Sequence, residues 1–130
     1  MNKFAMSRIR RTSGKFMGMD TLILTTVGRK TGEPRSTPVG WFPAGDDSWF
    51  VVASAAGARA NPAWYLNLAA HPDRATIEIA GQSIPVSARE LHGSERDGQW
   101  ATIKAAVPRF AQYEQKTDRQ LPIIELTRRS

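Results

Sequence analysis

Three cations and several hydroxyl side chains lie in one short segment, residues 28–38, between two runs that are typical of β-strands. The cations are Arg29, Lys30 and Arg35. The flanking runs are apolar and β-branched, and the segment holds two glycines, so the cations are expected on or beside a hairpin turn. Lys30 and Arg35 can converge there on one phosphate or carboxylate, with turn amides and hydroxyls as further donors. A solvated basic turn that binds nothing is the alternative.

The second half of this segment is expected to alternate between the two faces of a strand. Successive strand positions point to opposite faces, which directs Arg35 and Thr37 to one side and Ser36 to the other. The candidate binding residues of the segment are Arg29, Lys30, Arg35, Ser36, Thr37 and Pro38.

A second candidate site opens a predicted helix at residues 61–67. Asn61 followed by proline is a typical helix start, with asparagine as the N-cap. A helix N-terminus presents unpaired amides, so a loop that carries Arg59 into this start can bind an anion or a carbonyl group. Trp64 and Tyr65 offer flat apolar surface to an aromatic ligand. The alternative is that Trp64 belongs to the core face of the helix and Asn61 only caps it.

Together the two segments suit a long ligand with an anionic tail and a planar head. The sequence shows no sign of a hydrolase or of a nucleotide-binding motif. There is no nucleophile elbow, paired-carboxylate pattern, Walker loop or dinucleotide fingerprint. The chain has no cysteine and its two histidines lie in unrelated segments, so no catalytic metal is expected. This pattern favours a protein that holds and orients a redox cofactor, which itself carries the difficult chemistry.

The composition is typical of a single folded domain. The chain has 130 residues, of which 41% are hydrophobic and 23% charged. Its net charge of +6 is concentrated in residues 1–19, which contain five basic residues and no acidic one. Because no basic stripe is interleaved with aromatics, nucleic acid is not an expected partner. No apolar run approaches the length of about 20 residues that spans a bilayer, which favours a cytoplasmic protein.

The apolar spacing predicts an amphipathic helix over residues 3–17, in a basic N-terminal unit (1–19) that precedes the main domain (20–130). Packing on the domain is one role for this helix. The alternatives are a lid over the ligand, and peripheral contact of residues 1–18 with an anionic surface such as the inner face of the membrane.

Six short strands with two or three inserted helices are expected in the main domain, an α+β pattern dominated by antiparallel pairing. The expected strands are 22–27, 39–42, 48–54, 74–80, 83–91 and 121–126. The first three are expected to form a meander, and Pro85 predicts an edge or an interruption in the fifth. Helices are expected from Pro62 to about Ala70 and from Gly93 to about Val107.

Four blocks, in order, resemble the deazaflavin (coenzyme F420)-dependent nitroreductase family of the split β-barrel F420/FMN-binding superfamily. The blocks are 24–35, 51–54, 61–67 and 117–123. The resemblance implies a mainly antiparallel split β-barrel of about six strands with flanking helices. It also implies a reductase, of a kind known mostly from actinobacteria, that uses reduced F420. This cofactor has a flavin-like deazaflavin head, a phosphate and an oligoglutamate tail.

The same resemblance implies roles for individual residues. Lys30 and Arg35 would hold the phosphate, and Ser54 with the loop after it would lie along the deazaflavin. Trp64 and Asn67 would help to shape the pocket, next to Asn61.

This chain departs from the family pattern in two places. A lysine often follows the serine of the second block in relatives, whereas Ala55 removes that cation and leaves Arg59 to compensate. The segment beside the hydride acceptor has Val107, Phe110 and Tyr113, where the family's nitroreductase is richer in tyrosine. Phe110 would wall the substrate pocket and Tyr113 would donate a hydrogen bond or a proton, unless both are ordinary packing aromatics.

The expected activity is hydride transfer from the deazaflavin C5 to an electron-poor small molecule, such as a quinone, an enone or a nitro compound. Tyr113 and Ser54 are the expected catalytic residues. F420 is the expected cofactor and FMN the alternative, while a non-catalytic carrier of F420 or a tetrapyrrole is the alternative outside enzymes. A monomer or a homodimer is expected.

Overall fold

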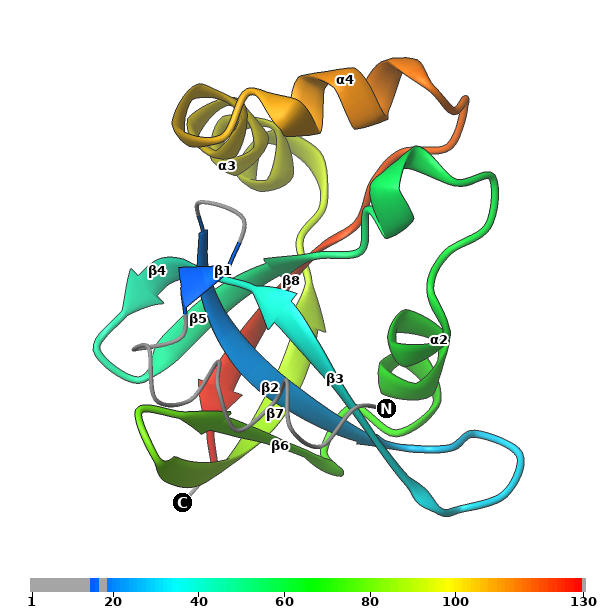
Figure 1. Cartoon of the computed structure of the whole chain (residues 1–130), viewed down its shortest axis with the longest axis vertical. Coiled ribbons are helices and arrows are strands. Elements are labelled where there is room, and N and C mark those ends of the chain that lie inside the picture. The colour runs from blue at the N-terminus through cyan, green and yellow to red at the C-terminus, as the bar shows by residue number, and fades with distance from the viewer. Residues whose placement is uncertain (1–14, 17–18, 130) are drawn as a thin grey trace.

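Eight strands and four helical segments make up the residues that the computed structural model describes, 15–16 and 19–129 (Figure 1). The strands are β1 (Lys15–Phe16), β2 (Met19–Val27), β3 (Pro34–Gly40), β4 (Phe42–Gly45), β5 (Ser48–Val52), β6 (Ala75–Ile79), β7 (Gln82–Glu90) and β8 (Ile123–Arg128). The helical segments are the 3₁₀ turn η1 (Ala55–Gly57), α2 (Ala63–Ala70), α3 (Gly93–Ala106) and α4 (Arg109–Gln115). The predicted α+β class is confirmed.

The sheet is curled because its two edges are joined by a single residue. The antiparallel order runs β3, β2, β6, β7, β8, β5, β4, and β1 adds to the start of β2. Strands β3 and β4 therefore lie at opposite edges, yet only Trp41 separates them in the chain. A sheet whose edge strands are consecutive in the chain has to bend round on itself, which produces the expected split barrel (Figure 1). The Trp41 amide donates to Asp20 O at 2.9 Å and ties the crossing point to β2.

Eight strands replace the six that were expected, for local reasons. Strand β3 begins at Pro34, so the second half of the basic segment belongs to the barrel. The expected strand 39–42 is divided at Trp41, where the chain passes from one edge to the other. The predicted meander of the first three strands is wrong, because β5 pairs with β4 and β8 rather than with β3.

The prediction that Pro85 marks an edge or an interruption is also wrong, since β7 is continuous and pairs on both sides. Pro85 lies opposite Thr76 of β6, just before the residues of β7 that pair with β8. Its carbonyl accepts from Arg129 N at 2.9 Å, on the side away from β6. The N and O of a strand residue point to the same side, so the missing N–H removes no bond of the β6–β7 ladder.

Helix α2 begins one residue later than expected and ends where expected. Pro62 is its extended N-cap, and no side chain caps it. The capping role predicted for Asn61 is therefore wrong, because its Oδ1 accepts from Arg119 Nη1 at 2.7 Å instead. A charged guanidinium is a stronger donor than a backbone amide, which explains the exchange of partners. The helix expected from Gly93 is confirmed as α3.

Most of the predicted N-terminal helix lies outside the described residues, as do the lid and membrane roles proposed for residues 1–18. Its last part does not fit the prediction, because Lys15–Phe16 forms β1. In the part of the chain that the structure describes, no helix has both the length and the apolar character to cross a membrane.

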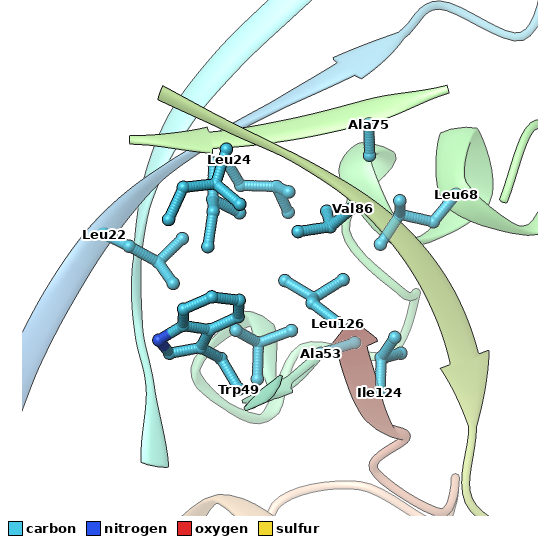
Figure 2. Packing of buried hydrophobic residues seen from close by; sticks show 12 residues of the cluster. Leu22, Leu24, Trp49, Ala53, Leu68, Ala75, Val86, Ile124 and Leu126 are labelled. Atoms are coloured by element: carbon cyan, nitrogen blue, oxygen red, sulfur yellow. The ribbon is translucent and has the colours of Figure 1, made fainter. Parts of the chain in front are cut away.

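Two separate clusters of buried side chains stabilise the fold. The first fills the barrel, where Leu22, Leu24 and Trp49 meet Val86 and Leu126 (Figure 2). The second lies between the barrel and the helices α3 and α4, which sit together at one end of it (Figure 1). Its members are Val52, Leu91, Trp100, Ile103, Phe110, Leu121 and Ile123. The barrel and its helical cap are thus packed around different cores.

A half-buried tyrosine joins α2 to the barrel. Tyr65 Oη donates to Glu90 Oε1 of β7 at 2.5 Å. Burial, together with the hydrogen bond to the Glu90 carboxylate and its charge, raises the pKa of Tyr65 from 10.0 to about 12. The protonated phenol is therefore favoured in the folded state.

We expect this pair to contribute a loss of stability at high pH. A group whose pKa is raised on folding stabilises fully below its unfolded pKa, here 10.0, and loses this contribution as the pH rises through about 12. The urea-unfolding free energy should fall less steeply over this window in Tyr65→Phe than in the parent. Leu66→Ala, which removes an exposed side chain that does not titrate from the same helix, should keep the parental slope. Equal slopes in the parent and Tyr65→Phe would contradict the assignment.

Candidate functional site

A cavity of about 430 Å³ lies between the β2–β3 hairpin and the first turns of α2. The two segments singled out in the sequence, 28–38 and 61–67, form its walls together. Its lining residues are Thr26, Gly28, Arg29, Lys30, Thr31, Arg35, Ser36, Thr37, Ala63, Trp64 and Asn67. Segments more than twenty residues apart therefore meet at one site, as Figure 1 shows for the hairpin tip and α2.

The hairpin loop is held closed by its own backbone. Gly28 N donates to Glu33 O and Gly32 N to Gly28 O, both at 2.8 Å. Gly32 has a φ of +74°, a conformation that favours glycine. A Cβ on Gly28 would lie 2.7 Å from Thr31 Oγ1, so a side chain there would displace the threonine. The tightly closed loop presents its cations at the mouth of the cavity.

The buried amide of Asn67 connects the two walls. Its Oδ1 accepts from Arg29 N at 3.1 Å and from Arg29 Nη1 at 3.2 Å. Its Nδ2 donates to Thr26 Oγ1 at 3.1 Å. Asn67 is 4% exposed and Thr26 1%, so the bond between them is shielded from water, while the two bonds from Arg29 are partly buried. The position of α2 relative to the hairpin is thereby fixed by one side chain.

The three cations of the cavity are not equivalent. All three are exposed, but the Arg29 guanidinium is bonded to Asn67, whereas no such bond to the cavity wall holds Lys30 or Arg35 within the described residues. Arg35 Nη2 lies 3.8 Å from Glu33 Oε2, and because both side chains are exposed this ion pair is weak. Lys30 and Arg35 are thus the cations that are most accessible to an anionic ligand.

Register within the hairpin agrees with the alternation expected from the sequence. Arg35 lies opposite Thr26, which lines the cavity, while Ser36 lies opposite Thr25. The Ser36 and Thr25 hydroxyls share a hydrogen bond of 2.7 Å, so the Ser36 hydroxyl already has a partner even though the residue contributes to the lining.

Several predicted site residues lie elsewhere. Pro38 pairs with Ile23 further along β3 and does not line the cavity. Arg59 lines a separate polar cavity of about 370 Å³ with Gln115, Lys116, Thr117, Asp118 and Arg119. Ser54 and Ala55 lie at η1, where the Ser54 carbonyl accepts from Arg119 Nη2 at 2.8 Å.

The predicted substrate wall is largely part of the second core. Phe110 is 5% exposed and makes edge-to-face contacts with Phe42, Trp100 and Tyr113, at centroid distances of 6.0, 6.1 and 5.8 Å. Its geometry is that of the packing alternative. Val107 and Tyr113 pack against the same core but are only partly buried. Of the predicted substrate residues, Tyr113 therefore has the accessible polar group.

Sequence reasoning missed four lining residues, Thr26, Gly28, Thr31 and Ala63, and it missed Arg119 as a partner of the η1 loop. The expected pairing of the strands flanking the basic turn is the signal that places Thr26 opposite Arg35. Arg119 belongs to the fourth block of the family resemblance, but nothing in that block indicates its acceptors.

The cavity has the chemistry of an anion-binding site beside an aromatic wall. Lys30 and Arg35 offer charged donors, and Trp64 offers a flat apolar surface. Among the described residues no group of three or more His, Asp or Glu is placed to hold a metal ion. The arrangement suits the binding and orientation of an anionic ligand with a planar part.

Comparisons with known proteins agree with this geometry. A family model described as F420H(2)-dependent quinone reductase matches residues 2–128. The F420H(2)-dependent quinone reductase Rv1261c of Mycobacterium tuberculosis is 33% identical over 112 residues, which cover 84% of this chain and 74% of that protein.

Solved structures resemble this chain at two levels. An F420-H2 dependent reductase (FDR-A) is 33% identical with a TM-score of 0.72, covering 82% of this chain and 92% of that one. A structure described as a domain-swapped dimer has the same identity and TM-score and covers 82% and 78%. HutZ, a heme storage protein of Vibrio cholerae, is 14% identical with a TM-score of 0.63, covering 98% and 90%, and shares the fold alone.

Removing the Asn67 amide should destabilise the fold. Asn67→Ala leaves the Thr26 hydroxyl and the Arg29 backbone amide without their partner, at a cost of about 1–3 kcal/mol in unfolding free energy. Urea denaturation measures the loss. Leu66→Ala is the matched control, because Leu66 is the exposed neighbour on the same helix and its truncation should cost about 0.5 kcal/mol or less. Equal costs for the two variants would show that the buried amide has no special part.

Proposed function

Because this chain belongs to the F420H(2)-dependent quinone reductase family, we propose that it is an F420-dependent enzyme that reduces a quinone. The observation that carries the proposal is the cavity in which Lys30 and Arg35 face the wall formed by Trp64 and Asn67. A phosphate-bearing cofactor with a planar ring needs both a cationic cradle and an apolar wall. Membership of the family identifies the cofactor, and Lys30 and Arg35 are the hydrogen-bond donors that this chain offers to its phosphate.

The donor set fits the anionic part of F420. Lys30 and Arg35 are exposed, and a phosphate that binds them would replace only the weak ion pair between Arg35 and Glu33. Arg29, held by Asn67, adds positive potential without having to move. The tail that follows the phosphate also carries negative charge, which the same three cations favour.

Each group of this chain then has one task in hydride transfer. When bound, reduced F420 supplies the hydride from its deazaflavin C5, and the quinone takes up this hydride and one proton to become a hydroquinone. Lys30 and Arg35 would hold the phosphate and thereby determine how far from the hairpin the deazaflavin ring lies. Trp64 would exclude water from one side of the cavity, and Ser54, which lies outside the cavity lining at η1, would border a ring that extends beyond it. Tyr113 Oη is the proposed proton donor to the quinone oxygen.

We further propose a homodimer, on the basis of the similar structure described as a domain-swapped dimer. Membrane contact through residues 1–18 stays a prediction, since those residues lie almost entirely outside the described part of the chain.

Removal of the two accessible cations should weaken cofactor binding. Lys30→Ala/Arg35→Ala should raise the Kd for F420 by about 100-fold and flatten its salt dependence, because charged hydrogen bonds contribute about 1.5–3 kcal/mol each. Calorimetric titration at several salt concentrations measures both effects, with FMN and haem as competing candidate ligands for the parent. Arg74→Ala/Arg128→Ala removes the same charge from exposed positions outside the cavity and should leave the Kd within about threefold.

Two results of this titration would reject the proposal. The first is a parent protein that prefers FMN or haem to F420. The second is a Kd for F420 that is unchanged in the Lys30/Arg35 variant, which would locate the phosphate elsewhere.

The proposed proton donor is tested by removing its hydroxyl. Tyr113→Phe should lower kcat for quinone reduction by about 10²-fold while the Kd for F420 stays constant, since a positioned general acid contributes about 10²–10⁴-fold. Steady-state kinetics with a soluble quinone measure the change. Tyr65→Phe is the control, because the Tyr65 hydroxyl is engaged by Glu90. An unchanged kcat would assign the proton to solvent.

A further inference from the structure

One guanidinium holds the whole loop between β5 and α2. Arg119 follows α4 in the chain and precedes β8. Its Nη1 donates to Ala53 O at 3.1 Å and to Asn61 Oδ1 at 2.7 Å. Its Nη2 donates to Ser54 O at 2.8 Å, and its Nε to Ala58 O at 2.9 Å. The beginning, the middle and the end of the loop are thus bound to the same rigid fork of donors.

The loop has a conformation that needs such support. Ala55 and Ala56 have φ values of 45° and 54°, in the left-handed region that residues with a Cβ rarely adopt. Gly57 follows with a φ of 80°, and a Cβ there would lie 2.8 Å from Tyr113 O. Backbone of this kind persists only where its surroundings enforce it. Arg119 supplies that constraint from one side and α4 from the other.

The acceptors of Arg119 are all neutral, and burial lowers the pKa of its guanidinium. Within the described residues no ion pair of Arg119 with a carboxylate is found. The four hydrogen bonds of this partly desolvated guanidinium all go to one loop. They fix the geometry of the loop and provide no attraction to a counter-ion.

The loop that Arg119 fixes joins two groups of residues in the proposed site, Ser54 and the residues of α2 that line the cavity. Ser54 is at its start, and Asn61 leads directly into α2, which carries Trp64 and Asn67. The Ser54 hydroxyl has no partner among the described residues, so it is available to a ligand. Arg119 itself lies four residues after the end of α4, the helix that carries Tyr113.

We propose that Arg119 is a positioning residue for hydride transfer, which aligns the Ser54 loop and the start of α2 with α4. The inference rests on the proposed function. Its direct effect is on the geometry of the loop, and its effect on catalysis follows because misplacement by about 1 Å costs on the order of 10²-fold in rate. Affinity for the phosphate is set at the hairpin and stays independent of it.

The test compares Arg119→Gln and Arg119→Lys with Arg129→Gln. Arg129 is the matched control because its guanidinium also donates to backbone carbonyls, Val86 O at 3.0 Å and Ala75 O at 3.4 Å. It follows β8, which ends on the side of the barrel away from α3 and α4 (Figure 1). The readouts are kcat and KM for F420H2 at saturating quinone, and hydrogen exchange of the Gly57 and Ala58 amides in the protein without cofactor.

Arg119→Gln should lower kcat by about 10- to 100-fold with KM for F420H2 within about threefold of the parent, as expected for lost alignment. Exchange at Gly57 and Ala58 should accelerate by about tenfold or more, as expected for a loosened loop. Arg119→Lys, which keeps the charge but not the fork, should fall between the parent and Arg119→Gln. Arg129→Gln should leave kcat and these two amides unchanged within about twofold.

A kcat of Arg119→Gln within about twofold of the parent overturns the proposal, as does an equal loss of kcat in Arg129→Gln, which would indicate general destabilisation. If Arg119→Gln does not fold, Asn61→Ala removes one acceptor and keeps the arginine. Its kcat should fall by about threefold or more, and an unchanged kcat overturns the proposal in that case. Should the parent not bind F420, the proposed function fails, while the exchange rates still decide whether Arg119 fixes the loop.

Discussion

The passage of the chain from one edge of the sheet to the other through Trp41 is the constraint on which the rest of the structure depends. Since β3 and β4 are consecutive but lie at opposite edges, the sheet has to curl, and the curl creates the interior that the apolar faces of the strands fill. It also leaves the β2–β3 hairpin extending beyond the barrel beside α2 (Figure 1). The cavity exists because a hairpin and a helix meet outside a closed core.

The connection between hairpin and helix is polar, and this choice has a physical consequence. An apolar contact tolerates sliding, whereas the Asn67 amide uses its oxygen for Arg29 and its nitrogen for Thr26 in one relative position. Buried polar groups that are fully satisfied favour a single arrangement. Arg119 fixes the neighbouring loop by the same means. The cavity walls are therefore held by directional bonds, while the two cores provide most of the burial.

Much of the fold and one half of the site could be predicted from the sequence, because they depend on local patterns. The basic turn, the start of α2 near Asn61 and the antiparallel pairing each rest on a few consecutive residues. The burial of Phe110 could not be predicted, since it depends on Phe42 and Trp100 arriving from other elements. Nor could the acceptors of Arg119, which lie about sixty residues earlier in the chain. The role of a residue cannot be predicted from sequence spacing when it depends on contacts between distant segments.

The division of the buried side chains into two clusters has a consequence for how this enzyme can be altered. The barrel cluster and the cap cluster share no residue, although they adjoin at Val51–Val52 of β5 and Ile123–Ile124 of β8. Val107, a partly buried position between α3 and α4, packs against the cap cluster and not against the barrel cluster. The cap can therefore be repacked as a unit of its own, and under the proposed function such changes would act on the acceptor rather than on the hairpin that binds the cofactor.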